Sequence, residues 1–179
     1  PAESILDAVE GRKRSGFPDH AAFMLYLENH DETRYIVECG DAATKAAAGA
    51  LFTLPGIPML YGGQELGQRG TRDALAWDHA RDDVRSQYDD LIELKQAHPS
   101  LGPDGGLERI DYEADSEAVV AFAREGEANR YVVLLNFGDE TATVGIDERV
   151  DATDLVSEES RAAESGLTVE DVAVFEAER

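Results

Sequence analysis

The chain has 179 residues, of which 42% are hydrophobic, and its 38 acidic and 16 basic side chains give a formal net charge of −22. This length allows one domain or two small ones, and the hydrophobic content excludes a disordered acidic tail. Because so negative a field repels nucleic-acid phosphates and anionic lipids, we expect neither nucleic acid nor a membrane as a partner.

Lysine is scarce in this acidic composition. Only Lys13, Lys45 and Lys95 are lysines, so most of the positive charge comes from arginine. An excess of carboxylates suits molar salt, where the screening length falls to about 3 Å and self-repulsion costs little. We therefore expect a halophilic protein, cytoplasmic or secreted, with an acidic mesophilic protein as the alternative.

The ends and the cysteine content say little about the compartment. The chain begins at Pro1 rather than at a methionine, so we expect processed protein or part of a longer polypeptide. No apolar run approaches the roughly 18 residues of a membrane-spanning helix, and no signal peptide is apparent. Cys39 is the single cysteine, which excludes an internal disulfide.

The first half of the chain begins with a predicted helix and a predicted strand. Ser4 is a plausible cap for a helix that ends between Gly11 and Pro18. Residues 21–27, "AAFMLYL", are apolar without alternation, which is typical of a parallel strand buried on both faces. An alanine-rich helix then follows, with Asp41 as its cap, and stops before Pro55.

A second short strand, residues 57–61, precedes a glycine-rich loop and a third helix within residues 83–101, "DVRSQYDDLIELKQAHPSL". The third helix places Val84, Tyr88, Leu91 and the Leu94–Lys95 position on one helical stripe. His98 is expected to be exposed at its end. The order helix, strand, helix, strand, helix indicates β/α units with a parallel sheet. So few elements cannot cover the apolar strands on both faces. We expect the missing cover to come from other chain or from a neighbouring molecule.

The pattern changes at "LGPDGG", residues 101–106. Beyond it, short apolar runs alternate with turn signals, and "REGEANR" between two such runs predicts a hairpin loop. Residues 101–179 hold 21 acidic and 6 basic side chains, so this half carries most of the negative charge. The second half is therefore predicted to be all-β.

Polar side chains follow both predicted strands of the first half. Asn29, His30 and Asp31 come after the first strand, and Gln64 and Glu65 follow the second. In β/α folds, functional side chains gather at the carboxyl ends of strands, so one expectation is that Gln64 and Glu65 project beside Asp31. The alternative is a flexible glycine loop with solvated polar residues. From the residues alone, a catalytic corner and a polar turn that caps a helix both stay open.

Metal and sugar-stacking sites have weaker support in the sequence. The four histidines and the cysteine lack zinc spacing, and the acidic residues do not follow an EF-hand pattern, so no metal site is expected. Trp77 is either a platform for sugar stacking or a packing residue. A carbohydrate-binding role for the second half would need exposed aromatic residues. Its aromatic residues lie in strand-like runs and are expected in the core instead: Tyr112, Phe122, Tyr131, Phe137 and Phe175.

Three motifs carry a family resemblance. "FMLYLENHDETRY", "ALFTLPGIPMLYGGQELG" and "YDDLIELKQAHPSL" occur in this order and spacing, and together they resemble the alpha-amylase family, glycoside hydrolase family 13. The resemblance implies that residues 1–102 are the last β/α units of an incomplete TIM barrel. Residues 103–179 would form an antiparallel β-sandwich, so the implied fold class is α/β plus all-β.

The resemblance also implies roles for individual residues. Asp31 would match the carboxylate that stabilises the transition state, and His30 and Asn29 would bind or support the same sugar. Three further residues are implied as substrate-binding: Arg34, Tyr61 and Glu65. Glycosidic cleavage passes through an oxocarbenium-like state, so contacts to ring hydroxyls that strengthen during reaction lower the barrier.

The sequence departs from the family in one respect. Retaining hydrolysis needs a nucleophile and an acid/base about 5–5.5 Å apart, and the motifs that carry them are missing here, as are the family's usual calcium-binding segments. We expect a parent enzyme that acts on α-glucans or malto-oligosaccharides, with calcium possible in the parent and no cofactor in this chain. The chain alone should be inactive. The alternative is a non-catalytic module that binds carbohydrate or self-associates through exposed barrel strands.

Overall fold

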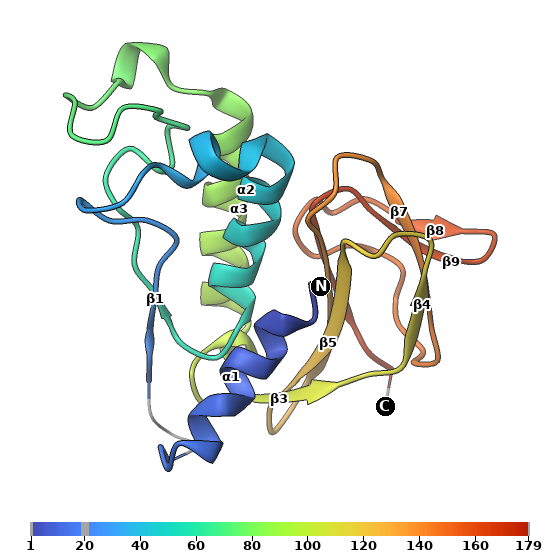
Figure 1. Ribbon diagram of the computed structural model, residues 1–179. Coiled ribbons are helices and arrows are strands. Elements are labelled where there is room, and N and C mark those ends of the chain that lie inside the picture. Colours follow the sequence, from blue (N-terminus) through green and yellow to red (C-terminus); the bar gives the residue numbers. More distant parts are fainter. Residues whose placement is uncertain (1, 19–21, 179) are drawn as a thin grey trace.

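The computed structural model describes residues 2–18 and 22–178. Three helices stand between a short pair of parallel strands and a β-rich second half (Figure 1). No helix in the described ranges is long and apolar enough to cross a membrane. The elements of the first half are α1 (Ser4–Arg14), β1 (Met24–Leu25), α2 (Tyr35–Thr53), β2 (Ile57–Pro58), η1 (Trp77–His79), α3 (Asp82–Ala97) and η2 (Pro99–Leu101).

Helix α1 ends at Arg14, within the range expected from the sequence. Ser4 is its first helical residue rather than a flanking cap, and the helix continues through Gly11 to Arg14. The turn that follows contains Gly16 with a φ of 86°, a conformation that favours glycine. Leu6 is buried and joins the core shared by α2 and α3, so α1 is held by its apolar face.

Strands β1 and β2 are parallel, as predicted, but much shorter than the apolar runs around them. Met24 pairs with Ile57 and Leu25 with Pro58. Alternate side chains point to opposite faces: Leu25 packs against the helical core, whereas Met24, Tyr26 and Ile57 are 62%, 45% and 53% exposed. The chain therefore covers the strand on one face only, in agreement with the expectation that its own elements cannot cover both faces. The expected start of the strand at Ala21 lies outside the described residues.

Helix α2 begins at Tyr35, six residues before the expected cap at Asp41. Gly40 has φ 83° and ψ 177°, which interrupts the helix with a kink. Asp41 follows the kink, and its Oδ1 accepts a hydrogen bond from Arg81 at 2.6 Å. The helix ends at Thr53, before Pro55, as predicted. Gly49 allows a close approach to the second half, because a Cβ there would lie 2.7 Å from Val172.

Helix α3 confirms its predicted apolar stripe. Val84, Tyr88, Leu91 and Leu94 are all buried against α2 and its neighbours. His98 is half-buried rather than exposed, because its Nδ1 lies 2.9 Å from the Tyr131 hydroxyl and the two rings meet edge to face. The end of α3 is thereby attached to the β-rich half.

The second half consists of antiparallel strands, as predicted. They form two four-stranded sheets, with the orders β10-β6-β5-β3 and β4-β7-β9-β8. The loop of the β5–β6 hairpin lies inside the predicted "REGEANR" segment. The strands are β3 (Gly106–Arg109), β4 (Tyr112–Ala114), β5 (Val119–Glu125), β6 (Arg130–Asn136), β7 (Ala142–Ile146), β8 (Ala162–Ala163), β9 (Gly166–Val169) and β10 (Val172–Glu176).

The sheet that contains β5 and β6 is buried on both faces. Phe122 and Val133 point toward α2 and α3, whereas Ala121, Val132 and Phe175 pack against the second sheet. This explains why the run "VVAFA" shows no alternation of apolar and polar residues. The predicted division after residue 102 falls between η2 and β3, and it stays a prediction.

A buried arginine and a half-buried lysine bind carbonyl oxygens at the carboxyl end of α2. Arg124, on β5, is fully buried and donates hydrogen bonds to five carbonyl oxygens, those of Thr53, Leu101, Gly102, Gly105 and Gly106. Lys95 Nζ donates to the Phe52 and Leu101 oxygens at 2.9 and 2.7 Å. The last carbonyls of a helix lack partners within the helix and carry its negative dipole end, so cations suit this position.

Candidate functional site

The loop between β1 and α2 presents the candidate corner. Asn29 Oδ1 accepts a hydrogen bond from the Asp31 backbone amide at 2.8 Å, and Asn29 Nδ2 donates to Glu32 at 3.0 Å. The side chains of His30 and Asp31 are 68% and 70% exposed, and His30 Nε2 lies 3.2 Å from Asp31 Oδ2. Asn29 thus shapes the turn, while His30 and Asp31 project outward with their polar atoms accessible.

Neither Asn29 nor Asp31 caps α2, so this loop is not a polar turn that caps the following helix. The residue at the amino end of α2 is Arg34, which makes no side-chain cap bond. The Tyr35 amide instead donates to Glu28 Oε2 at 2.7 Å. Because a buried carboxylate from the end of β1 satisfies this helix amide, Asp31 is left without a structural capping role.

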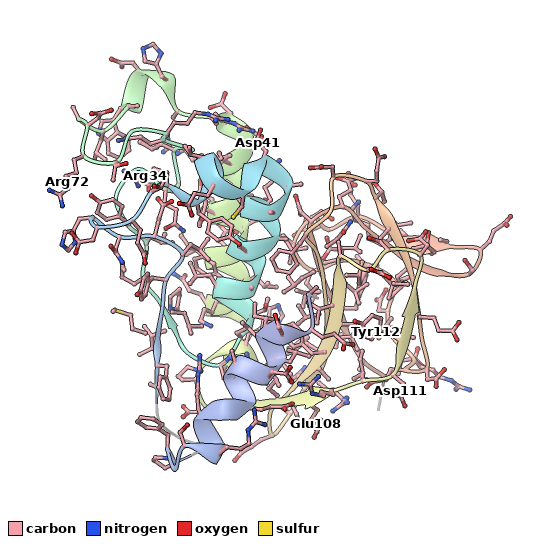
Figure 2. All side chains as sticks on the ribbon, in the orientation of Figure 1. Arg34, Asp41, Arg72, Glu108, Asp111 and Tyr112 are labelled. Atoms are coloured by element: carbon pink, nitrogen blue, oxygen red, sulfur yellow. The ribbon has the colours of Figure 1, made fainter. Side chains whose placement is uncertain are left out.

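Arg72 is a member of the corner that sequence reasoning missed. Its Nη2 lies 3.2 Å from Asp31 Oδ1, and its Nε donates to the His30 carbonyl oxygen at 3.0 Å. Arg72 comes from the loop after β2 and lies at the outer edge of the molecule (Figure 2). Nothing in the sequence singles out this arginine, since the contact spans 41 residues.

The other residues expected at the second strand end form hydrogen bonds with groups other than Asp31. Gln64 is buried, and its Nε2 donates to the Tyr88 hydroxyl at 2.7 Å, so the expectation that it lies beside Asp31 is wrong. Glu65 Oε2 accepts from the Gly63 amide at 3.0 Å within its own loop. Tyr61 is half-buried, and its hydroxyl donates to Thr71 O at 3.2 Å.

Arg34 lies inside the protein, beneath the corner. Its side chain is 2% exposed, and its Nη1 is 2.6 Å from Glu28 Oε1, a carboxylate that is itself 3% exposed. Nε and Nη2 donate to the Gly70 and Gly62 oxygens, each at 2.9 Å, and the guanidinium lies 4.5 Å from the centre of the Tyr61 ring. A substrate contact needs an accessible side chain, so the structure corrects the substrate-binding role that the resemblance implied for Arg34.

The remaining candidates have clear positions. Trp77 is 60% exposed on η1, so it does not pack into the core of the described chain. The five aromatic residues of the second half are buried or partly buried in the core, as expected. Within the described part of the chain, no group of three or more His, Cys, Asp or Glu side chains could hold a metal ion.

A parallel β/α unit with polar residues at its strand ends, followed by antiparallel sheets, is typical of a barrel enzyme with a C-terminal β domain. The family model described as "Alpha amylase, catalytic domain" matches residues 9–122, and the chain therefore belongs to the alpha-amylase family. A second model, "Beta-galactosidase C-terminal domain", matches residues 119–176.

Similar proteins agree with this assignment. "Alpha-amylase MalA" of Haloarcula japonica is 55% identical over 99% of this chain, which spans 28% of that relative. Its source agrees with the halophilic composition. "Neopullulanase 2" of Thermoactinomyces vulgaris is 31% identical over 78% of the chain, which spans 25% of its length. A solved alpha-amylase from Lactobacillus plantarum is 22% identical and has the same fold, with a TM-score of 0.77 over 98% of this chain and 42% of its own.

Proposed function

We propose that this chain is the C-terminal part of an alpha-amylase-type glycoside hydrolase that cleaves α-glucosidic bonds of starch and malto-oligosaccharides with retention of configuration. The exposed corner of Asn29, His30 and Asp31 carries this proposal, because its carboxylate and imidazole are accessible at the end of a strand. Family membership supports the reaction class. The alpha-amylase from Geobacillus thermoleovorans, which was solved in complex with acarbose, supports an oligosaccharide-like ligand.

In this proposal Asp31 accepts hydrogen bonds from sugar hydroxyls. These bonds strengthen as positive charge develops on the ring, so they lower the barrier rather than only holding the substrate. His30, 3.2 Å from Asp31, contacts the same sugar, and Asn29 keeps the turn in shape. Tyr61 and Glu65 rim the cleft from the next strand, and Arg72 adds donors beside Asp31.

The nucleophile and the acid/base belong to other strands in this proposal. Residues 1–102 form the last units of the barrel and 103–179 its C-terminal β-sandwich, so the chain alone does not hydrolyse starch. The remaining barrel strands cover the exposed face formed by Met24, Tyr26 and Ile57. Calcium, where the parent uses it, binds to segments outside this chain.

The test is Asp31→Asn in the complete polypeptide. Losing a contact made in the transition state acts on turnover, so kcat should fall by roughly 10²–10³, the range for a lost charge-stabilising group. Asp111→Asn is the matched control, an exposed aspartate that Figure 2 shows in the β-rich half. If kcat falls no further in Asp31→Asn than in Asp111→Asn, the proposed role of Asp31 is refuted.

A second property is proposed for the isolated chain, on the basis of the same bare strand face. Contiguous exposed apolar surface rarely stays unpaired in a monomer. Met24 on β1, Tyr26 just after β1 and Ile57 on β2 are all exposed. The 179-residue chain should therefore self-associate. Light scattering in high salt that finds only a 19.5 kDa monomer contradicts this.

A further inference from the structure

The loop between β1 and α2 takes part in two ion pairs, one buried and one exposed. The Arg34–Glu28 pair has side-chain exposures of 2% and 3%, whereas both side chains of the Arg72–Asp31 pair are 70% exposed. Exposed pairs are screened by water and salt and hold their partners weakly. The contact between Arg72 and Asp31 is therefore too weak to set the geometry of the corner. A buried pair is screened far less, so Arg34 and Glu28 are placed to do so.

Each polar contact of Arg34 reaches a different segment. Nη1 binds Glu28 at the end of the first strand region, Nη2 binds Gly62 just after the second, and Nε binds Gly70 close to Arg72. The other oxygen of Glu28 accepts the Tyr35 amide. The pair thus closes the loop that carries Asn29, His30 and Asp31, and attaches it to the loop that carries Arg72.

Only an arginine can make this set of bonds at once. Its planar guanidinium directs donors along fixed and different directions, whereas a lysine ammonium is a compact charge without a fork. The face of the guanidinium is also used, because it lies over the Tyr61 ring at 4.5 Å. A lysine would keep the charge beside Glu28 but would not reach the Gly62 and Gly70 oxygens together.

We propose that Arg34 is a positioning residue for the reaction: through Glu28, Gly62 and Gly70 it fixes the Asn29–Asp31 turn against the loop that carries Arg72, so that Asp31 and Arg72 meet the substrate in one geometry. This inference rests on the proposed function. Arg34 itself does not touch substrate. Small displacements of a positioned group reduce turnover steeply, by about 10²-fold for 1 Å, so the effect of loosening the loop falls on kcat.

The first experiment uses the complete polypeptide and malto-oligosaccharides. Arg34→Lys should lower kcat about 10- to 100-fold and change KM by less than about threefold, since the lost precision matters most in the transition state. Arg12→Lys is the matched control: Arg12 also donates to a backbone oxygen, that of Pro55, and lies over the Phe23 ring at 4.4 Å. Its kcat should be unchanged. A normal kcat in Arg34→Lys, or a rise in KM alone, overturns the proposal.

The second experiment is hydrogen exchange on the 179-residue chain, which needs no activity. Residues 62–76 contain several hydrogen-bonded amides, among them Gln68 N to Gly63 O and Ala76 N to the Gln68 side chain. Arg34→Lys should speed exchange in 29–35 and 62–76 while leaving α3 protected, and Arg12→Lys should not. Unchanged exchange, or a uniform rise over all segments, refutes positioning.

The two experiments separate the possible failures. If the unsubstituted polypeptide does not act on malto-oligosaccharides, the proposed function fails, and exchange still decides whether Arg34 orders the two loops. If Arg34→Lys does not fold, Glu28→Gln takes its place, because it keeps the shape and one oxygen of Glu28 while weakening the bond to Arg34. A lower kcat at similar KM in Glu28→Gln supports the proposal, and unchanged kinetics contradict it.

Discussion

Arg124→Met should be among the most destabilising substitutions in this chain. The change removes a fully buried guanidinium that donates to five carbonyl oxygens where α2, η2 and β3 meet. Lys95 still donates to the Leu101 oxygen and the Gly105 amide to the Gly102 oxygen, so the oxygens of Thr53, Gly105 and Gly106 lose the donor that Arg124 supplied. Burial lowers the pKa of Arg124 to about 10, so the side chain is charged at neutral pH.

The magnitude follows from these lost bonds. Each unsatisfied buried polar group costs about 1–3 kcal/mol, whereas removing a buried charge returns part of its desolvation penalty. We expect a net loss of about 3–5 kcal/mol, a large share of the roughly 5–15 kcal/mol that stabilises a typical domain. With a urea slope of about 2 kcal/mol per molar, the midpoint should fall by about 2 M.

The assay is urea unfolding at constant molar KCl, followed by far-ultraviolet circular dichroism. Arg124→Lys keeps the charge and as many as three donors, so its midpoint should lie between those of Arg124→Met and the unsubstituted chain. Arg149→Met is the matched control, because Arg149 is exposed, and it should change stability by less than about 0.5 kcal/mol. Equal midpoints for Arg124→Met and Arg149→Met would refute the reasoning.

Two further predictions concern packing and pH. Gly49→Ala should lower the melting temperature, because the new Cβ lies 2.7 Å from Val172 and overpacking costs about 1–3 kcal/mol, more than the roughly 1 kcal/mol gained in helix propensity. Its control, Gly11→Ala, meets nothing closer than Arg14 at 3.7 Å and should raise the melting temperature. Burial, and secondly the neighbouring Arg124 guanidinium, lowers the pKa of Lys95 to about 8 from 10.5. Between these values the unfolded chain binds more protons, so the Lys95 contribution to the free energy of unfolding should rise with pH. A urea-midpoint series from pH 7 to 10 should show this rise relative to Lys95→Met, and parallel curves would contradict it.

Local patterns in the sequence predicted two elements of the fold. The apolar stripe of α3 follows from its helical spacing, and the β5–β6 hairpin follows from the turn signal between two apolar runs; both are confirmed. The apolar run around β1 was predicted as a longer strand than the two residues that pair. A lone apolar run indicates what a strand can bury, but its paired length depends on the neighbouring strands, and in the described chain β1 has β2 alone.

The candidate site was predicted in position but not in composition. The motif placed Asn29, His30 and Asp31 at a strand end, where the structure exposes His30 and Asp31. It did not separate Arg34, which points inward, from Arg72, which reaches Asp31. Both are arginines near glycine-rich or acidic segments, and sequence neighbours do not show which way a long flexible side chain turns.

The sequence alone determined the acidic, salt-adapted character, the change from β/α to all-β near residue 102, and the family, because charge, periodicity and motif order are properties of the chain itself. Tertiary structure decided which polar groups are buried and what they bind. Arg34 finds its partners 6, 28 and 36 residues away, and Arg124 reaches Thr53 across 71 residues. A buried cation needs several oriented oxygens at once, and packing alone brings such distant carbonyls together.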